Sequence, residues 1–510
     1  MKKPILVFLL LVLWASPSAA QQAAEPQTPG PLEEFSGKVS VGYLSVTLDR
    51  NARAGEYEYL KSSAGGDLNL EWDPYPHRFL LESSYLNKKD YFGELDYAYR
   101  DVVLFNMYTR GMYHNLNHYS FGPLASSPPP VTFTDLNPND RYAVENQLNR
   151  AFIRFKTPDF PLHLYAEATT IGRDGLVQQR FLRGFTGNLD LVSQSRNVDW
   201  DAREVRMGVN SHLGPVEVDY SHAEKKFESN GDRVLSDAYA TFTAPHNLVP
   251  DLKSSTDMVK VHTSLTGRFV AGAAYSAGEK KNEDSGAKAD FRNAAGDLTL
   301  TPVAGLVLAF KYRHYDLSMS DPDTVTATTA AGPTTYNVRA SISSKRDVIA
   351  GMVRYRLSER LTAKAEYTAD AAERGAGAGP NSWDVSHRTL KSTEKIGLSY
   401  RIMNRLSLRA DYSATQVSNP AYADDPDRSN AANATVTWTP GQRIIALASY
   451  GGVREKRDGL TAPLAGGGRK SDRDQALGSI TLLVGNRASL TAGYLYLKNK
   501  TAETLTFANA

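Results

Sequence analysis

Hydrophobic and polar residues alternate along much of this chain. In residues 406–412, leucine, alanine and tyrosine occupy one set of alternate positions, and serine, arginine and aspartate occupy the other. Residues 216–220, 306–313 and 361–367 follow the same pattern. A period of two is typical of β-strands that have one apolar and one polar face. The pattern therefore predicts an all-β protein.

The alternating segments are joined in pairs by short turns rich in Gly, Pro, Asn and Ser. Such turn chemistry between two alternating segments indicates a β-hairpin. We expect ten of these hairpin turns, which lie within EWDPYPHRF, YAYRDVVLF, FKTPDFPLH, SHLGPVEV, SLTGRFV, TPVAGLV, RLSERLT, RIMNRLS, TPGQRII and LVGNRAS. The strands that follow the turns often end their apolar face on a tyrosine, namely Tyr85, Tyr220, Tyr275, Tyr312, Tyr367, Tyr412, Tyr450 and Tyr494.

The connections on the other side of the hairpins are expected to be long. They fall at about 111–145, 172–197, 228–256, 316–340, 369–388 and 453–473. A soluble β-sandwich also alternates, but it requires neither short and long connections in turn nor aromatic residues at the end of the apolar face. Both features are typical of transmembrane barrels, which have short periplasmic turns and long extracellular loops. We therefore predict a large single-chain antiparallel transmembrane β-barrel over residues 35–510.

The number of strands follows from the turns. A first strand near 38–48 is expected to ascend, a loop at 47–63 to lie outside, and residues 68–72 to descend to the first turn. Ten hairpins and this first strand make 21, and residues 503–510 would supply a short further strand. We predict about 22 strands, within a range of roughly 20 to 26. The sequence ends in Phe-Ala-Asn-Ala rather than in a terminal aromatic residue.

The N-terminus has the features of an export signal. Lys2 and Lys3 precede an apolar run at 5–14, and Ser-Ala-Ala at 18–20 forms a small-residue cleavage site. The alternative is a membrane anchor, for which the apolar run is shorter than the ~20 residues required. We interpret residues 1–20 as a signal peptide and the Pro/Ala/Gln-rich residues 21–34 as a flexible periplasmic linker. The expected location is the Gram-negative outer membrane.

Charge and cysteine content exclude several functions. The chain has 58 Lys+Arg and 56 Asp+Glu, and removal of Lys2 and Lys3 leaves 56 of each. A neutral mature chain argues against nucleic acid as the partner. There is no cysteine, which excludes disulfides, thiolate metal sites and covalently attached c-type haem on this chain.

Candidate sites for catalysis or metal binding are few. His114 and His118 are four residues apart, but they lie in or beside a long loop, and we see no carboxylate near them in the sequence. Acidic loop residues could bind calcium outside the cell, although solvated loop charges are the simpler interpretation: Asp321, Asp323, Asp424, Asp425 and Asp427. No hydrolase, zinc-protease or nucleotide-binding motif occurs. We expect no enzyme, and we assign no catalytic, cofactor-binding or metal-binding residue.

The polar face of the strands should line the barrel lumen. Charges of both signs are expected there: Arg154, Lys156, Glu167, Arg206, Glu217, Asp219, Lys311, Arg313, Arg354, Lys364, Glu366, Arg409 and Asp411. They could form a solvated wall paired across strands, or a lumen that receives a polar protein or a wide water column. A barrel of this size is too wide for its own side chains to fill, and about fifteen residues before the first strand are too few for a globular plug.

Three segments in the first half of the chain have distinctive sequences. They are YRDVVLFNMYTRGMYHN (99–115), NQLNRAFIRFKTPDFPLHLYAEATTIGRDGLVQQRFLRGF (146–185) and HLGPVEVDYSHAEKKF (212–227). They resemble the MtrB/PioB-type outer-membrane proteins, the porin sheaths of porin–cytochrome conduits, and the resemblance covers roughly residues 35–227. This chain departs from some members in lacking a C-x-x-C near the mature N-terminus, and it is short for the family.

The resemblance implies a barrel that houses a periplasmic multihaem c-type cytochrome and so supports electron transfer across the outer membrane. An extracellular multihaem cytochrome would dock outside, and haem would be carried only by these partners. The alternative is a general or substrate-specific diffusion porin. A loop folded into the lumen would favour the porin, and residues 111–145, with prolines at 128–130, are the candidate.

Overall fold

The chain was analysed as a computed structural model. It describes residues 35–503 apart from 46–61, 88, 120–130, 159, 186–187, 239–241, 264–267, 330–331, 376–382, 384, 423–424, 459–467 and 485–487. The described residues form strands and turns and contain no helix, which confirms the all-β prediction. Within these ranges, no helix long and apolar enough to cross a membrane occurs.

The strands are numbered in chain order. Their bounds are β1 Phe35–Leu44, β2 Ser63–Trp72, β3 His77–Asn87, β4 Asp90–Tyr99, β5 Val103–Leu116, β6 Val131–Asp135, β7 Tyr142–Lys156, β8 Leu162–Phe185, β9 Asn188–Leu213, β10 Val216–Ser229, β11 Leu235–Ala238, β12 Thr243–His246, β13 Leu252–Thr263, β14 Phe269–Asn282, β15 Lys288–Val303, β16 Leu306–Ser320, β17 Thr324–Thr329, β18 Gly332–Asn337, β19 Ser343–Arg356, β20 Leu361–Gly375, β21 Arg388–Met403, β22 Leu406–Ser418, β23 Arg428–Trp438, β24 Ile444–Arg457, β25 Arg469–Val484 and β26 Ala488–Glu503.

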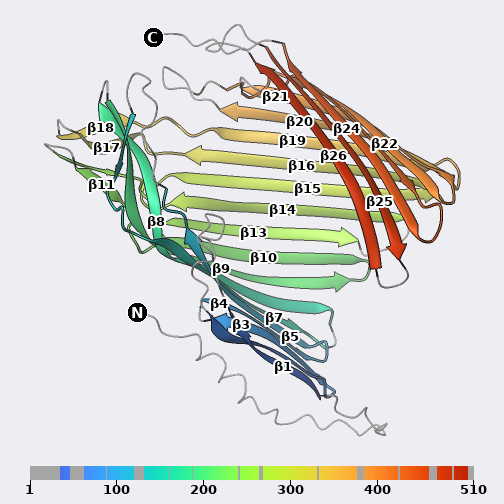
Figure 1. The fold of residues 1–510 in the computed structure, drawn as a ribbon, viewed down its shortest axis with the longest axis horizontal. Coiled ribbons are helices and arrows are strands. Elements are labelled where there is room, and N and C mark those ends of the chain that lie inside the picture. Colours follow the sequence, from blue (N-terminus) through green and yellow to red (C-terminus); the bar gives the residue numbers. More distant parts are fainter. Residues whose placement is uncertain are drawn as a thin grey trace.

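One sheet of 22 strands contains nearly all of them (Figure 1). Twenty-one strands pair with their chain neighbours in an antiparallel series from β1 to β26, and the short β6 pairs in parallel with β9. Two small hairpins, β11–β12 and β17–β18, stand apart from the sheet. The expected number of 22 is met, although the additional strand is β6. The part of the predicted terminal strand that lies beyond Glu503 is outside the described residues.

The ten predicted hairpins are confirmed by the antiparallel pairing of their strands, and the turn residues 264–267 and 485–487 lie outside the described residues. Between strand bounds the turns range from two residues, as at 214–215, to five, as at 157–161. Each turn reverses the chain at one end of the sheet, so neighbouring strands can satisfy their backbone hydrogen bonds in register.

The predicted long connections are partly wrong. Residues 172–197 are not a loop, because β8 and β9 continue through them as strands of 24 and 26 residues. Their register runs unbroken from Leu162 paired with Ser211 to Phe185 paired with Asn188. The glycines and charges that interrupt the alternation here do not prevent pairing, since each strand supplies the backbone partners of the other. The connections β3–β4 and β14–β15, at 88–89 and 283–287, are also short.

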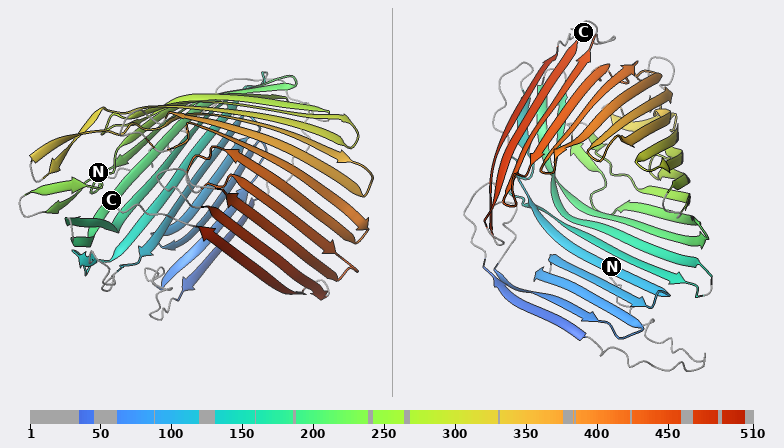
Figure 2. Two further views of the ribbon diagram at one scale, coloured as in Figure 1. Left: turned by 90° about the horizontal axis from the view of Figure 1, so that it is seen from above. Right: turned by 90° about the vertical axis from the view of Figure 1, so that its right-hand side faces the viewer.

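The sheet is strongly curled, and its two edges are β1 and β26 (Figure 2). In the described residues, β1 pairs only with β2 and β26 only with β25. Twenty reversals separate β1 from β26, so the two edge strands run in the same direction. The sheet is therefore an open ring. If its two edge strands paired directly with each other, they would pair in parallel.

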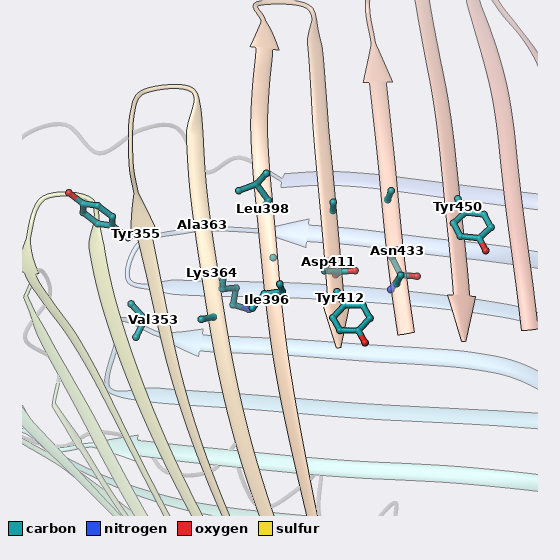
Figure 3. A pocket seen from close by; sticks show the side chains of 15 residues that line it. Val353, Tyr355, Ala363, Lys364, Ile396, Leu398, Asp411, Tyr412, Asn433 and Tyr450 are labelled. Atoms are coloured by element: carbon teal, nitrogen blue, oxygen red, sulfur yellow. The ribbon is translucent and has the colours of Figure 1, made fainter. Parts of the chain in front are cut away.

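The two faces of the curled sheet differ in chemistry. On β14 the apolar face runs from Phe269 to Ala277 and on β22 from Leu406 to Ala414, nine residues in each case (269–277 and 406–414). In Figure 3, Tyr355, Tyr412 and Tyr450 lie on the near side of their strands, with the N-terminal strands, drawn in blue, behind them. The apolar face is thus convex, and the charged face is turned inward. A shallow depression of about 740 Å³, lined largely by apolar atoms, lies on the convex face across β19–β24.

Tyrosines mark one boundary of this apolar belt, as the sequence predicted. The hydroxyl groups donate to a polar side chain of the next strand at 2.7–2.9 Å: Tyr220 to Asp257, Tyr312 to Asp347, Tyr412 to Asn430 and Tyr450 to Asp474. Beyond them the convex face carries charges, such as Glu279 and Lys281 on β14. A tyrosine with an apolar ring and a hydrogen-bonded hydroxyl suits the boundary between an apolar and a wet layer.

Candidate functional site

The predicted lumen charges share one face of the sheet. Directly paired residues point to the same side, and the register places Glu167 opposite Arg206 and Lys364 opposite Arg354. Most of these charges have partners close by: Arg154 and Lys156 with Asp101, Glu167 with Arg150, Arg206 with Glu204, Glu217 with His212 and His262, Asp219 with Tyr165, Arg313 with Asp297, Lys364 with Glu366, and Asp411 with Lys395.

Lys311, Arg354 and Arg409 differ from the other predicted lumen charges. Among the described residues they form no ion pair, although all three lie on the charged face. The concave wall therefore combines paired charges with cations that no described residue neutralises.

A turn at the short-turn end anchors two of the lumen cations. Asp101, in the turn between β4 and β5, accepts hydrogen bonds from Arg154 (2.6 Å) and from Lys156. The hydrogen bond from Lys156 lowers the pKa of Asp101, and Arg154 adds to the effect. Asp101 therefore stays ionised and ties this turn to the end of β7.

Histidines gather around Glu217 in a way the sequence did not reveal. His262 Nε2 and His212 Nδ1 lie 3.1 and 3.5 Å from Glu217 Oε2, and the His163 ring lies 5.5 Å from that of His212. These residues come from four strands, so only the register brings them together. In the part of the chain that the structure describes, no group of three or more His, Cys, Asp or Glu could hold a metal ion.

The long-loop end of the sheet carries most of the fully buried apolar side chains. The extended β8–β9 hairpin, β6, β11–β12 and β17–β18 gather there (Figure 1). The buried apolar residues of this cap are Tyr142, Val144, Val192, Val198 and Leu235. The cap is a small hydrophobic core at the rim of the ring, which the sequence pattern assigned to loops.

Arg196 holds the cap together. Its side chain is 4% exposed and donates hydrogen bonds to three backbone carbonyls: Asp232 at 2.9 Å, Arg233 at 2.8 Å and Asn247 at 2.7 Å. A guanidinium has five N–H donors, so one side chain can satisfy several buried carbonyls. Arg196 therefore fastens the segment that contains β11–β12 onto β9.

A second network joins the other parts of the cap. Arg183 donates to Asp190 at 2.8 Å and to Asp237 at 3.1 Å. Asp190 in turn accepts hydrogen bonds from Thr132 and Thr134 of β6. Strands β6, β8, β9 and β11 are thus linked through one arginine and two carboxylates.

His118 also belongs to the cap, and here the sequence interpretation was wrong. A carboxylate does lie beside it: Nε2 is 2.5 Å from Asp135 Oδ2, and Nδ1 is 3.0 Å from the carbonyl oxygen of Asp140. Asp135 is 17 residues away in sequence, and the fold of the loop brings it close. His114 lies on β5, opposite Val144. The two histidines therefore lie in different places, His114 on a strand and His118 in the loop.

We expect the loop around His118 to loosen as the pH rises. Both ring nitrogens face acceptors, so the hydrogen bond to Asp135 raises the pKa of His118 above 6.5. The stabilisation is fully present below pH 6.5 and is lost as the pH rises through the raised value. Its size is on the order of 1 kcal/mol. Hydrogen exchange of residues 112–119 and 131–141 between pH 5.5 and 8.5 measures this loss.

The His118→Asn variant is the control for this prediction. Because its amide does not titrate in this range, the protection of the loop should be the same at both pH values once intrinsic exchange rates are removed. Equal pH dependence in the variant and the parent chain would contradict the prediction.

The acidic loop residues serve the local backbone in the structure. Asp321 accepts hydrogen bonds from the backbone and hydroxyl of Ser341, Asp425 from the backbone of Tyr422, and Asp427 from the backbone of Asp458. The backbone carbonyl of Asp323 accepts from Val338. Asp424 lies outside the described residues. These contacts stabilise the local loop conformation.

Comparison with known proteins gives structural likeness only. No protein-family model matches the sequence, and no curated protein matches it. Solved structures that align with it include the FrpB iron transporter from Neisseria meningitidis (9% identity, 86% of this chain and 79% of that chain, TM-score 0.48) and the ferric yersiniabactin uptake receptor FyuA from Yersinia pestis (10%, 86% and 77%, 0.48). The copper transporter OprC aligns at 9% identity over 90% of this chain and 75% of that chain, with a TM-score of 0.49. With TM-scores below 0.5, these likenesses carry no argument about this chain.

Proposed function

We propose that residues 35–510 form an outer-membrane β-barrel that houses a periplasmic multihaem c-type cytochrome and so supports electron transfer across the membrane. The observation that carries the proposal is the curled sheet of 22 strands with an apolar convex face and a concave face of mixed charge. Such a sheet has one face for lipid and one for a wet, polar interior.

The width of the apolar belt supports the membrane assignment. Nine residues on β14 and on β22 (269–277 and 406–414) agree with the 9–11 residues that a tilted strand needs to cross a bilayer. The tyrosines stand at one end of the belt, where an interfacial girdle belongs. In hydrocarbon an unpaired strand edge is costly, so β1 and β26 must be paired in the membrane, directly or through another strand.

The character of the concave face supports a protein occupant. A barrel of this size leaves an interior wider than its own side chains can fill. The described parts of residues 111–145 belong to the rim, since β5 extends to Leu116 and β6 pairs with β9. These described parts give no support to a porin that is constricted by this loop. Residues 120–130, which contain the three prolines, lie outside the described residues. The resemblance of residues 99–115, 146–185 and 212–227 to MtrB/PioB-type sheaths supports a multihaem cytochrome as the occupant. The chain has no cysteine to attach a c-type haem covalently, which agrees with a partner as the carrier of the haem.

The test is affinity purification of the tagged full chain from detergent-solubilised outer membranes, followed by haem staining. We expect a c-type cytochrome in fixed stoichiometry that survives salt washing, and none with an unrelated tagged barrel expressed to the same level. A haem-free barrel would contradict the proposal. If that barrel conducted ions in a planar bilayer, the diffusion porin would become the better account.

A further inference from the structure

Cations gather on one arc of the concave face. Arg354, Arg356, Lys364, Arg401 and Arg409 lie on the charged side of four neighbouring strands, β19 to β22, within a few residues of the short turns. We call them the basic arc. Arg354, Arg356, Arg401 and Arg409 are exposed, so their guanidinium groups are available to a ligand in the lumen.

The basic arc is not neutralised by the part of the chain that the structure describes. Arg354 stands directly opposite Lys364, an arrangement of like charges that weakens a sheet. Lys364 contacts Glu366, but Arg354, Arg356, Arg401 and Arg409 form no ion pair with any of the described residues. Repulsion between like charges lowers the stability of the sheet. Such a loss of stability is expected where the charges bind a ligand instead of stabilising the fold.

Carboxylates gather in the same way on another arc. Glu82 of β3 stands directly opposite Glu94 of β4, and Asp96 follows on the same face. Glu71 lies on the charged face of β2. The side chains that hydrogen-bond to this acidic arc are neutral: Asn106 donates to Glu94 at 3.3 Å and to Asp96 at 2.7 Å, and Asn69 donates to Glu82 at 3.4 Å. No ion pair neutralises these four carboxylates in the described residues.

The two arcs lie on opposite sides of the ring. In the antiparallel series of 21 strands, β3 and β4 are third and fourth, and β19 to β22 are fourteenth to seventeenth. Their centres are twelve strands apart, slightly more than half of the series. Figure 2 shows the N-terminal strands in blue and the C-terminal strands in orange on different sides of the curled sheet. The basic arc and Glu71 lie near the short turns, and Glu82 and Glu94 lie at the middle of their strands.

We propose that these arcs bind and orient the protein in the lumen, with its acidic side against the basic arc and its basic side against the acidic arc. The inference rests on the proposed function for the presence of that protein. Opposite fields on two walls favour one rotational position of an occupant with matching charges and oppose the reverse position, where like charges would meet. The sheath would thereby fix the orientation of the haem protein as well as enclose it.

The test uses the purified full-length barrel and two short peptide probes, hexaglutamate and hexalysine, at low ionic strength. The Arg354→Gln/Arg401→Gln/Arg409→Gln variant should bind hexaglutamate roughly tenfold more weakly than the parent chain and hexalysine no more weakly. The matched Glu82→Gln/Glu94→Gln/Asp96→Asn variant should show the reverse. Each variant relieves like-charge repulsion, so both should fold, as unchanged heat-dependent gel mobility would show.

Two results would overturn the inference. The first is that the parent chain binds neither peptide, and the second is that both variants lose affinity for both peptides to the same extent. Haem staining of the affinity-purified parent chain decides the proposed function separately. If haem co-purifies but the peptides do not discriminate between the variants, the sheath stands and the orienting role of the arcs fails. If the peptides discriminate and no haem co-purifies, the arcs bind charged surfaces and the cytochrome assignment fails.

Discussion

The Ala448→Arg variant should lose about 2–4 kcal/mol of folding free energy in a lipid bilayer, a factor of roughly 30 to 1,000 in the folded-to-unfolded ratio. Ala448 lies in the middle of the apolar belt on β24, paired with Val436 on one side and Gly478 on the other. A guanidinium at this depth must leave water or deform the bilayer around it. Urea unfolding of the protein in lipid vesicles measures the change.

The adjacent residue provides a matched control. Ser449 is on the same strand but faces the concave side, since its partners are Thr435 and Leu477. The Ser449→Arg variant should change the folding free energy by less than about 1 kcal/mol, because its guanidinium enters a wet lumen. Equal losses in the two variants would contradict the assignment of the faces.

The Arg196→Met variant should open the long-loop cap. Loss of the guanidinium leaves three backbone carbonyls without their donor, and each costs about 1–3 kcal/mol where water does not reach it. Met has a similar unbranched stem, so the change removes the hydrogen bonds with little change in volume. We expect amide protection in residues 232–238 and 242–247 to fall by at least roughly tenfold, as measured by hydrogen exchange.

Arg203 provides the comparison for Arg196. It lies on the same strand, its side chain is 61% exposed, and its partner is Asp201 on that strand. An exposed pair of this kind contributes about 0–1 kcal/mol, so the Arg203→Met variant should leave the protection of the cap unchanged. A cap equally protected in the Arg196→Met variant would show that the hydrophobic core around Val192 and Val198 holds it alone.

The repeating part of the fold could be predicted from the sequence because it depends on local chemistry. A period of two identifies a strand, and turn residues between two such strands identify a hairpin. Both signals are complete within about fifteen residues, and all ten turns were found in this way. The tyrosines were assigned to one face for the same reason, since parity along a strand fixes the side to which a residue points.

The cap could not be predicted because its contacts join distant parts of the chain. Arg196 lies 36 residues from Asp232 and 51 from Asn247, and nothing in the sequence around any of them indicates the others. The extension of β8 and β9 was missed since its alternation is interrupted at 172–175. Pairing between the two strands, rather than the pattern of either one, keeps them extended there.

The sorting of lumen charges by sign was hidden for a related reason. The sequence shows that both signs occur on the polar face in similar numbers, which agrees equally with charges paired across strands and with a lumen that receives a polar protein. Only the register shows that Glu82 meets Glu94 and that Arg354 meets Lys364. Charges on neighbouring strands neutralise each other only if the register of the two strands places them side by side. The alternation along one strand shows which face a residue is on, but it does not give the register with the next strand.

The proposed barrel requires the curled sheet to close, with β26 brought to β1 directly or through another strand. The chain has no cysteine, so two introduced cysteines can form a disulfide within the chain only with each other. Val39→Cys on β1 would be combined in turn with Leu490→Cys, Ala492→Cys and Tyr494→Cys on β26. The Leu482→Cys/Leu490→Cys pair, directly opposed in the β25–β26 hairpin, is the positive control.

The measurement is cross-linking of these pairs in intact outer membranes, read as a shift in gel mobility. If β26 contacts β1 directly, at least one pair should form a disulfide, which requires Cα atoms within about 7 Å. If another strand lies between them, the separation is about 10 Å, and a bismaleimide of matching length should cross-link the pair where oxidation does not. Either result agrees with a closed barrel. Failure of every β1–β26 pair with both reagents, while the control pair cross-links fully, would contradict closure and with it the membrane-spanning barrel.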